Sequence, residues 1–183
     1  MVTKYPDIRC QVAMTPDHVR DAMILRSICF VHEHGISPSF IFDGNDHQAT
    51  HFVFYDGPEP VGSLRIRWFA DFAKYERTCF REKYRHPYTV KRCIQMTFGH
   101  VARKGYTQVL TQAEERLARL WTKLFDLEIA DTPPVQIAGH PHPYLTVFGS
   151  IPPCADPITM ESNSALLLGI EGQWDAMDQS ETS

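Results

Sequence analysis

Residues 75–105 are the part of the chain that most constrains its fold. Residues 75–80 suit a strand, and a basic turn follows. From Thr89 onward, apolar residues recur at helical spacing, at Val90, Ile94, Phe98 and Val101. The order strand, basic turn, amphipathic helix can hold a phosphorylated ligand, because the N-terminus of a helix favours anions. We therefore expect a binding site at this turn.

Length and charge bound the organisation of the chain. With 183 residues it has the size of one domain, which we place at residues 1–175, followed by a disordered tail at residues 176–183. The net charge is −4 and the basic residues are scattered, so no basic patch indicates nucleic-acid binding. We expect no nucleic-acid partner.

The cysteines and the hydrophobic pattern indicate where the chain acts. Its five cysteines show no Cys-x-x-Cys spacing, which argues against a disulfide framework and against a thiolate zinc site. No stretch approaches the roughly eighteen apolar residues of a membrane span, and Pro6 interrupts the region where a signal peptide needs an apolar run. The sequence therefore predicts a cytoplasmic protein that spans no membrane.

The N-terminal region predicts a strand followed by a helix. Residues 8–14 suit the strand. Thr15 then provides an N-cap, Pro16 a proline at the first helical position, and Asp17 an acid near the helix N-terminus. The helix is expected to end near Gly35, since glycine is the usual residue after a helix.

Three further segments precede the central motif, and one follows it. Residues 40–49 are expected to be a connecting loop. Residues 50–55 and 61–69 are rich in strand-forming residues and flank a turn, so they predict an antiparallel hairpin. Residues 106–111 predict a further short strand.

The hydrophobic pattern after residue 111 completes the prediction of the fold class. A third helix is predicted by an apolar face formed by Leu117, Leu120, Trp121 and Leu124. Residues 135–138 and 144–148 are expected to be the last strands. This order predicts an α/β or α+β fold, with a mixed, mostly antiparallel central sheet and helices on both faces.

Residues 75–89 resemble the central donor-binding motif of the GCN5-related N-acetyltransferase family. In that family a strand pairs with the pantetheine amides, and an Arg/Gln-x-x-Gly-x-Gly/Ala loop wraps the pyrophosphate. Arg85 matches the residue before the first glycine, whereas His86 and Tyr88 occupy the two glycine positions. The resemblance implies a donor site formed by Arg77, Thr78, Cys79, Phe80, Arg81, Arg85, His86, Tyr88 and Thr89.

The chain departs from this family pattern in two ways. Glycine lets a backbone approach phosphate closely, so His86 and Tyr88 argue against a tight pyrophosphate cradle for coenzyme A. Side chains could instead hold one phosphate, as on an acyl carrier protein, and the candidates are Arg81, Lys83 and Arg85. Trp121 and Phe125 replace the tyrosine and glycine of the family's later helix, so the usual proton donor to the leaving thiolate is absent. Alternatively, the segment is an ordinary strand, turn and helix with solvated arginines.

A second resemblance lies in the N-terminal half. The pattern is similar to that of acyl-homoserine lactone synthases and long-chain N-acyl amino acid synthases, and its residues are Arg26, Phe30, Asp43, Asp46 and Arg65. The resemblance implies that these residues contact the acceptor or shape the site. Lys74 replaces an acid of the lactone synthases, and Ile36 lies where an aromatic residue is expected, so S-adenosylmethionine binding is not predicted. The alternative is a structural ion-pair network of Arg26 and Arg65 with the two aspartates.

Acyl transfer to an amine requires a polarised carbonyl and a base. Backbone N–H groups where the strand parts from its neighbour after Arg77 could polarise the carbonyl. Glu76 is the candidate catalytic base because it lies on the same strand, although a salt-bridged glutamate is an equal alternative. Cys79 could form an acyl-cysteine, but no His or Asp is placed to activate it. The histidine clusters lack His-x-x-x-His spacing, so no metal is expected.

These patterns together predict an acyltransferase. We expect direct transfer of an acyl group from a thioester donor, acyl-coenzyme A or acyl carrier protein, to a small-molecule amine acceptor. A long-chain N-acyl amino acid synthase and a non-catalytic relative that binds acyl carriers as a sensor remain alternatives. A homodimer is left open.

Overall fold

The computed structural model describes residues 6–137 and 140–174, so the expected tail at residues 176–183 lies outside the described part. The described residues form one seven-stranded sheet of order β1-β2-β3-β4-β5-β7-β6. Its strands are β1 (Ile8–Val12), β2 (Thr50–Asp56), β3 (Glu59–Trp68), β4 (Ala73–Phe80), β5 (Gln108–Glu114), β6 (Glu128–Ile129) and β7 (Tyr144–Ser150). The helices are α1 (Pro16–Arg26), α2 (Pro38–Ile41), α3 (Pro87–Arg103), α4 (Glu115–Phe125) and α5 (Ser164–Leu168).

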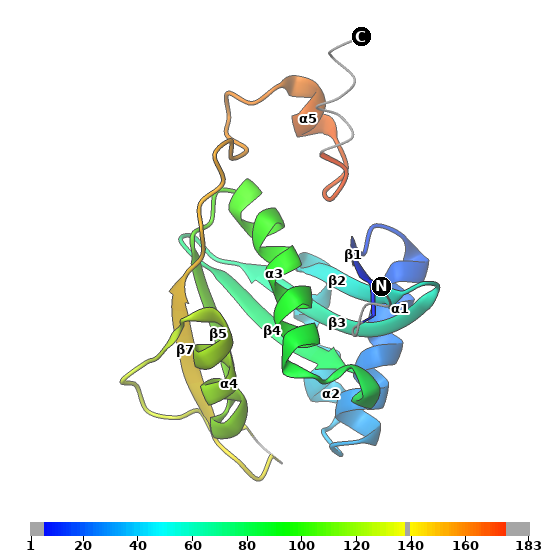
Figure 1. Cartoon of the computed structure of the whole chain (residues 1–183), viewed down its shortest axis with the longest axis vertical. Coiled ribbons are helices and arrows are strands. Elements are labelled where there is room, and N and C mark those ends of the chain that lie inside the picture. Colours follow the sequence, from blue (N-terminus) through cyan, green and yellow to red (C-terminus); the bar gives the residue numbers. More distant parts are fainter. Residues whose placement is uncertain (1–5, 138–139, 175–183) are drawn as a thin grey trace.

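All neighbouring strands pair antiparallel except β4 and β5, which are parallel. The predicted mixed, mostly antiparallel sheet is therefore confirmed. The parallel pair exists because α3 connects β4 to β5 and returns the chain to the same end of the sheet. Figure 1 shows α3 and α4 on one face of this sheet, with α1 on the opposite face.

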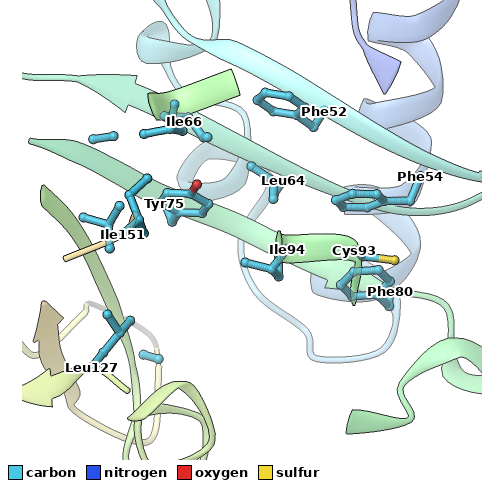
Figure 2. Packing of buried hydrophobic residues seen from close by; sticks show 14 of the residues in the cluster. Phe52, Phe54, Leu64, Ile66, Tyr75, Phe80, Cys93, Ile94, Leu127 and Ile151 are labelled. Atoms are coloured by element: carbon cyan, nitrogen blue, oxygen red, sulfur yellow. The ribbon is translucent and has the colours of Figure 1, made fainter. Parts of the chain in front are cut away.

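Side-chain alternation along the strands builds a core on each face. On β2, Phe52 and Phe54 belong to the cluster under α3, whereas Val53 and Tyr55 pack against α1. Figure 2 shows the first cluster, in which Phe54 stacks on Phe80 with ring centroids 5.3 Å apart. The prediction of helices on both faces is confirmed by these two clusters.

α1 begins as the sequence indicates and ends differently. The Thr15 hydroxyl accepts a hydrogen bond from the amide of His18 at 3.3 Å, and Pro16 is the first helical residue. After Arg26 the chain continues as a π-helical segment, Ser27–His32, rather than as α-helix. Gly35 follows with a φ of 66°, a conformation that glycine adopts without steric cost.

Several short elements correct the sequence-based assignment. The expected loop at residues 40–49 overlaps the end of α2 and contains a 3-10 turn, Gly44–Gln48. The expected strand at residues 135–138 is wrong: Val135 forms one isolated bridge to Tyr144, and residue 138 lies outside the described part. Two prolines precede Val135, and proline cannot donate to a strand ladder. β6 and α5 were not predicted.

One β-bulge interrupts the pairing of β3 with β4. Arg65 lies opposite Glu76 and Ser63 lies opposite Cys79, so β4 has one extra residue in this stretch. Arg77 has a φ of 52°, a left-handed conformation that is uncommon outside glycine. Because of the extra residue, Tyr75 and Phe80 both face α3 although five positions separate them.

The helices of the described residues are short or polar. None of those in residues 6–137 and 140–174 is long and apolar enough to cross a bilayer.

Candidate functional site

β4 and β5 separate in the middle of the sheet. Their parallel ladder joins Ala73–Tyr75 to Val109–Thr111 and ends there, while β4 continues to Phe80 and β5 to Glu114. Figure 1 shows the two strands diverging beyond this point. Arg77, at the bulge, lies two residues after Tyr75, the last residue of β4 that pairs with β5. The strands are thus separated where the prediction placed the separation, after Arg77, but they part already at Tyr75.

A pocket of about 330 Å³ occupies this separation, and we call it the β4–β5 pocket. Tyr75 and Trp121 line it from the α3 and α4 side, whereas Phe40 and Glu76 line it from the α2 side. The pocket therefore extends through the sheet from one face to the other. Its other lining residues are about equally apolar and polar: the apolar ones are Phe30, Ile36, Ile41, Ala113, Leu117, Val135 and Ile137, and the polar or charged ones are Asp43, Arg65, Lys74, Arg77, Thr78, Thr111, Gln112 and Tyr144.

Thr78 provides an unused polar group in this pocket. Its hydroxyl oxygen is buried and has no hydrogen-bond partner. A buried hydroxyl without a partner costs free energy, so such groups are rare outside binding sites and hydrated positions. Because this oxygen is buried, it can bind a polar atom of a ligand between β4 and β5 only if the Thr78 side chain rotates toward the pocket.

One side of the pocket ends at a cluster of charged side chains, which we call the Arg65 network: Arg26, Asp43, Asp46, Arg65, Glu76 and Arg77. Arg65 is at its centre and is 1% exposed. Its guanidinium lies 2.7 Å from Asp43, 2.8 Å from Asp46 and 2.6 Å from Glu76. Burial alone would lower the pKa of Arg65, but these three carboxylates raise it.

Arg26 extends the network under α1. It is fully buried and contacts Asp46 at 2.7 Å and the Nδ1 atom of His51 at 2.7 Å. Burial lowers the pKa of Arg26 despite the opposing effect of Asp46. Burial and the charge of Arg26 also lower the pKa of His51, which keeps its ring neutral. The ion-pair interpretation of Arg26, Arg65 and the two aspartates agrees with these contacts.

Arg77 joins β4 to α2. Its guanidinium donates hydrogen bonds to the carbonyls of Phe40 at 2.6 Å and Ile41 at 3.4 Å, and it contacts Asp43 at 3.1 Å. The Phe40 ring lies under this guanidinium, with 4.6 Å from its carbon to the ring centroid. The bulge directs the Arg77 side chain toward α2. Arg77 therefore lies where β4 has left β5 and also holds α2, which forms one wall of the pocket.

Glu76, the predicted base, is engaged in ion pairs. Its carboxylate contacts Arg65 at 2.6 Å and Lys74 at 2.9 Å. Burial would raise the pKa of Glu76, but Lys74 and Arg65 lower it below its usual range. The carboxylate is therefore ionised at neutral pH, and it lines the β4–β5 pocket. Its role as a base stays a prediction.

Tyr144 is a pocket residue that sequence reasoning missed. It begins β7, lines the pocket and lies opposite Glu114 in the β5–β7 ladder. Burial and the charge of Glu114 raise its pKa, so the phenol stays protonated at neutral pH. Glu114 in turn contacts His140 at 3.2 Å. Only the order of the strands brings this tyrosine to the pocket, and the sequence alone carried no signal for it.

Cys79 points away from the pocket. It lies in the cluster under α1 with Cys29, and its thiol is 3.5 Å from the hydroxyl of Ser63. The hydrogen bond with Cys29 and burial raise its pKa well above the usual range. A thiol with a raised pKa is a poor nucleophile, so the geometry favours direct transfer over an acyl-cysteine.

The predicted donor residues after β4 form the β4–α3 turn, residues 81–89. Arg81 is paired with Glu59, and Arg85 is paired with Glu33 and donates to the carbonyl of Phe80 at 2.7 Å. His86 caps α3, since its Nδ1 atom accepts a hydrogen bond from the Tyr88 amide at 3.2 Å. Phe80 and Thr89 are buried. The predicted residues are therefore adjacent, but several of their polar groups already have partners.

Among residues 6–137 and 140–174, no group of three or more His, Cys, Asp and Glu side chains is arranged to hold a metal ion.

Part of the chain is similar in sequence to a known protein. No protein-family model matches the chain. An uncharacterised N-acetyltransferase of Bacillus subtilis (strain 168), YjcF, is 30% identical over 78 residues, which cover 43% of this chain and 56% of that relative. The alignment thus spans little more than half of the relative's length.

Solved structures match a larger part of the chain. A candidate N-acetyltransferase from Lactobacillus plantarum has a TM-score of 0.71 at 24% identity, covering 78% of this chain and 97% of that one. An acyl-CoA N-acyltransferase from Pseudomonas aeruginosa has a TM-score of 0.63 at 16% identity, covering 79% and 99%. FeeM, an N-acyl amino acid synthase from uncultured soil microbes, has a TM-score of 0.64 at 11% identity, covering 79% and 91%. The chain therefore has the acyl-CoA N-acyltransferase fold.

Proposed function

We propose that the chain is an N-acyltransferase that moves an acyl group from a pantetheine thioester to an amine. The observation that carries this proposal is the β4–β5 pocket, which extends through the sheet where the ladder ends and contains the unpartnered hydroxyl of Thr78. A thioester arm can enter from the α3 and α4 side and an amine from the α2 side. The reacting atoms then meet at the bulge of β4.

The reaction needs no redox partner and no metal. The amine nitrogen attacks the thioester carbonyl, the new C–N bond forms and the C–S bond breaks. The amine loses one proton to a base, and the leaving thiolate gains one to become a thiol. Backbone N–H groups near Arg77, where β4 has no β5 partner, can stabilise the oxyanion that forms on the carbonyl.

We propose Glu76 as the base that accepts the amine proton, directly or through water. It lines the pocket on the side from which the amine enters and is ionised, although the pairing with Lys74 and Arg65 that lowers its pKa also makes it a weaker base than an unpaired carboxylate. The Arg65 network holds it in place through the 2.6 Å contact with Arg65. Tyr144 is the candidate donor of the proton to the thiolate, since it lines the pocket and stays protonated.

A second candidate is an N-acyl amino acid synthase, and the charge of the site favours it. Around the Arg65 network, the cations outnumber the carboxylates: Arg26, Arg65, Arg67, Lys74 and Arg77 face Asp43, Asp46 and Glu76. Excess positive charge beside a pocket can attract the carboxylate of an amino acid. The similarity in fold to FeeM is consistent with this candidate.

Thiol release tests both candidates and the sensor alternative. The chain is incubated with acetyl and palmitoyl thioesters of coenzyme A and of acyl carrier protein, each against a panel of amines and amino acids. Amine-dependent thiol release supports the N-acyltransferase, and a preference for palmitoyl donors with amino acids supports the synthase. Absence of release with every donor, together with measurable donor binding, would favour the non-catalytic sensor.

A further inference from the structure

The two halves of coenzyme A make different demands on the protein. Its pantetheine arm is a flexible chain with two amides, whereas its nucleotide half carries a diphosphate. A diphosphate is held by several backbone amides that point at it, usually at a helix N-terminus or in a concave loop of alternating right-handed and left-handed residues. In this fold the β4–α3 turn lies directly beyond the β4–β5 pocket, so it is where such amides would be required.

Several backbone amides of the β4–α3 turn are engaged within the protein, whereas those of Glu82, Lys83 and Thr89 have no such partner. Those of Arg81, Tyr84 and Arg85 donate to the carbonyls of Val61, Arg81 and Glu82, at 2.9, 2.8 and 3.1 Å. At the start of α3, Pro87 has no N–H and the Tyr88 amide is bound by the ring of His86. Of the first three helical positions this leaves Thr89, which is 5% exposed. The helix N-terminus therefore has little to offer a diphosphate.

The backbone of the turn also lacks the required curvature. No residue of the turn, all of which the structure describes, has a positive φ. The chain instead forms a 3-10 turn, Glu82–Tyr84, which directs its amides to carbonyls within the turn. His86 has an extended conformation, with φ −66° and ψ 132°. An anion-binding loop of alternating right-handed and left-handed residues is therefore not formed here.

Side-chain charges do not replace the missing amides. Arg81 and Lys83 both contact Glu59, the latter at 3.7 Å, and Arg85 is paired with Glu33. With Glu82 in the same turn, cations and carboxylates are balanced. The nucleotide half of coenzyme A adds a second phosphate of the diphosphate and a 3′-phosphate to the single phosphate of phosphopantetheine, and these added charges meet no excess of positive charge in the turn.

The site for the pantetheine arm, by contrast, is intact. The end of the β4–β5 ladder and the pocket of about 330 Å³ are available to a thioester, and the buried hydroxyl of Thr78 has no partner within the protein. We infer, building on the function proposed above, that the chain takes its acyl group from a 4′-phosphopantetheine thioester and gains little from the nucleotide half of coenzyme A. The thioester can be free or attached to a carrier protein.

A truncation series of donors tests this inference. The same acyl group is offered to the same amine on coenzyme A, on free 4′-phosphopantetheine and on a phosphopantetheine-bearing acyl carrier protein. Removing the nucleotide half is expected to change kcat/KM by less than about threefold, since each charge-assisted hydrogen bond that it made would contribute roughly tenfold. A loss of about 100-fold on going from acyl-coenzyme A to acyl-phosphopantetheine would overturn the inference. Comparison of kcat/KM for free acyl-phosphopantetheine and for the acyl carrier protein identifies which of the two is the better donor.

Calorimetry with 3′-phosphoadenosine 5′-diphosphate, the nucleotide half alone, provides a test that does not depend on turnover. No binding is expected at millimolar concentration, whereas binding in the micromolar range would contradict the inference. If no donor gives turnover, the proposed function fails, and this measurement still decides the inference by itself.

Two variants test whether the His86 cap on the Tyr88 amide causes the weak binding of the nucleotide half. His86→Gly with Tyr88→Gly releases the amide of residue 88, and it is expected to increase the affinity for the nucleotide half by about tenfold. Tyr88→Ala removes the same side chain but leaves His86 on that amide, so it should give no increase. Equal affinities in both variants and in the unaltered chain would overturn the assigned role of the capped amide.

Discussion

The β4–β5 pocket and the β4–α3 turn are adjacent on the same strand, yet they differ in what they offer a ligand. In the pocket, the strand ladder ends at Tyr75 and the hydroxyl of Thr78 has no partner. In the turn, four backbone amides and both arginines already have partners within the protein. In these two regions, a polar ligand finds a binding site where polar groups lack partners within the protein. The same architecture can therefore keep one half of a donor site and lose the other.

The largest expected effect concerns the support of the pocket. Arg65→Met leaves Asp43, Asp46 and Glu76 close together without their central cation. Breaking a buried ion pair in this way costs roughly 3–5 kcal/mol, so the free energy of unfolding in urea should fall by about that amount. Arg67→Met is the matched control, since the Arg67 side chain is 31% exposed and makes one ion-pair contact, at 3.7 Å, besides lying over the ring of Phe69. A loss as small as that of the control would contradict the central role of Arg65.

The next effect concerns catalysis in the pocket. Glu76→Gln should lower kcat by about 100-fold if Glu76 accepts the amine proton. Asp43→Asn also removes a carboxylate from Arg65, so it measures the loss that follows from disturbing the network alone. Steady-state kinetics of both variants separates the two effects. Equal losses would exclude Glu76 as the base.

The pH dependence of stability tests the ion pairs of Asp43 beside the pocket. Burial would raise the pKa of Asp43, but Arg65, the Asn45 amide and Arg77 bring it to about 2. Because this pKa is below that of an unfolded chain, Asp43 stabilises the fold above about pH 4, and the stabilisation is lost as the pH falls toward 2. Its size is on the order of 2 kcal/mol or less. Unfolding free energies measured from pH 2 to 6 should vary less in Asp43→Asn, and an unchanged slope would argue against this pairing.

A smaller effect is expected at the free hydroxyl. Thr78→Val removes a group without a hydrogen-bond partner, so it should not destabilise the fold. It should lower kcat/KM for thioester donors by about tenfold if the hydroxyl binds the donor, and Thr78→Ser should retain most activity. Kinetics and thermal unfolding of both variants test this. A valine variant with full activity would remove Thr78 from the donor site.

The smallest effect lies in the turn. His86→Gly removes the cap from the Tyr88 amide, and replacing a cap by glycine costs only a few tenths of a kcal/mol. The hydrogen-exchange rate of the Tyr88 amide should rise at the same time, because its acceptor is gone. An unchanged exchange rate would show that the ring of His86 does not occupy this amide in solution.

The sequence predicted the parts of the fold that depend on periodicity. The helical spacing from Val90 to Val101 and the hairpin before it correspond to α3 and to β2 with β3. The two-residue strand β6 and the five-residue helix α5 are too short to leave a periodic pattern. α2 has four residues, which is also too short for a periodic pattern, and its last two residues were assigned to the expected loop at residues 40–49.

The candidate site was predicted in part, and the missing part depends on strand register. The separation of β4 from β5 and the pairing of Arg26 and Arg65 with aspartates followed from sequence patterns. The bulge at Arg77 and the position of Tyr144 follow from which strands are neighbours, and local sequence does not encode this. The occupied amides of the turn depend on a single hydrogen bond of His86 and on the 3-10 turn before it.

The most direct test of the account is a crystal structure with a non-hydrolysable acyl-phosphopantetheine thioester analogue. We predict that the analogue's carbonyl lies between β4 and β5, within hydrogen-bond distance of Thr78 or of the neighbouring backbone amides. Strands paired from Ala73 through to Phe80 and Glu114, with the analogue bound elsewhere, would contradict it.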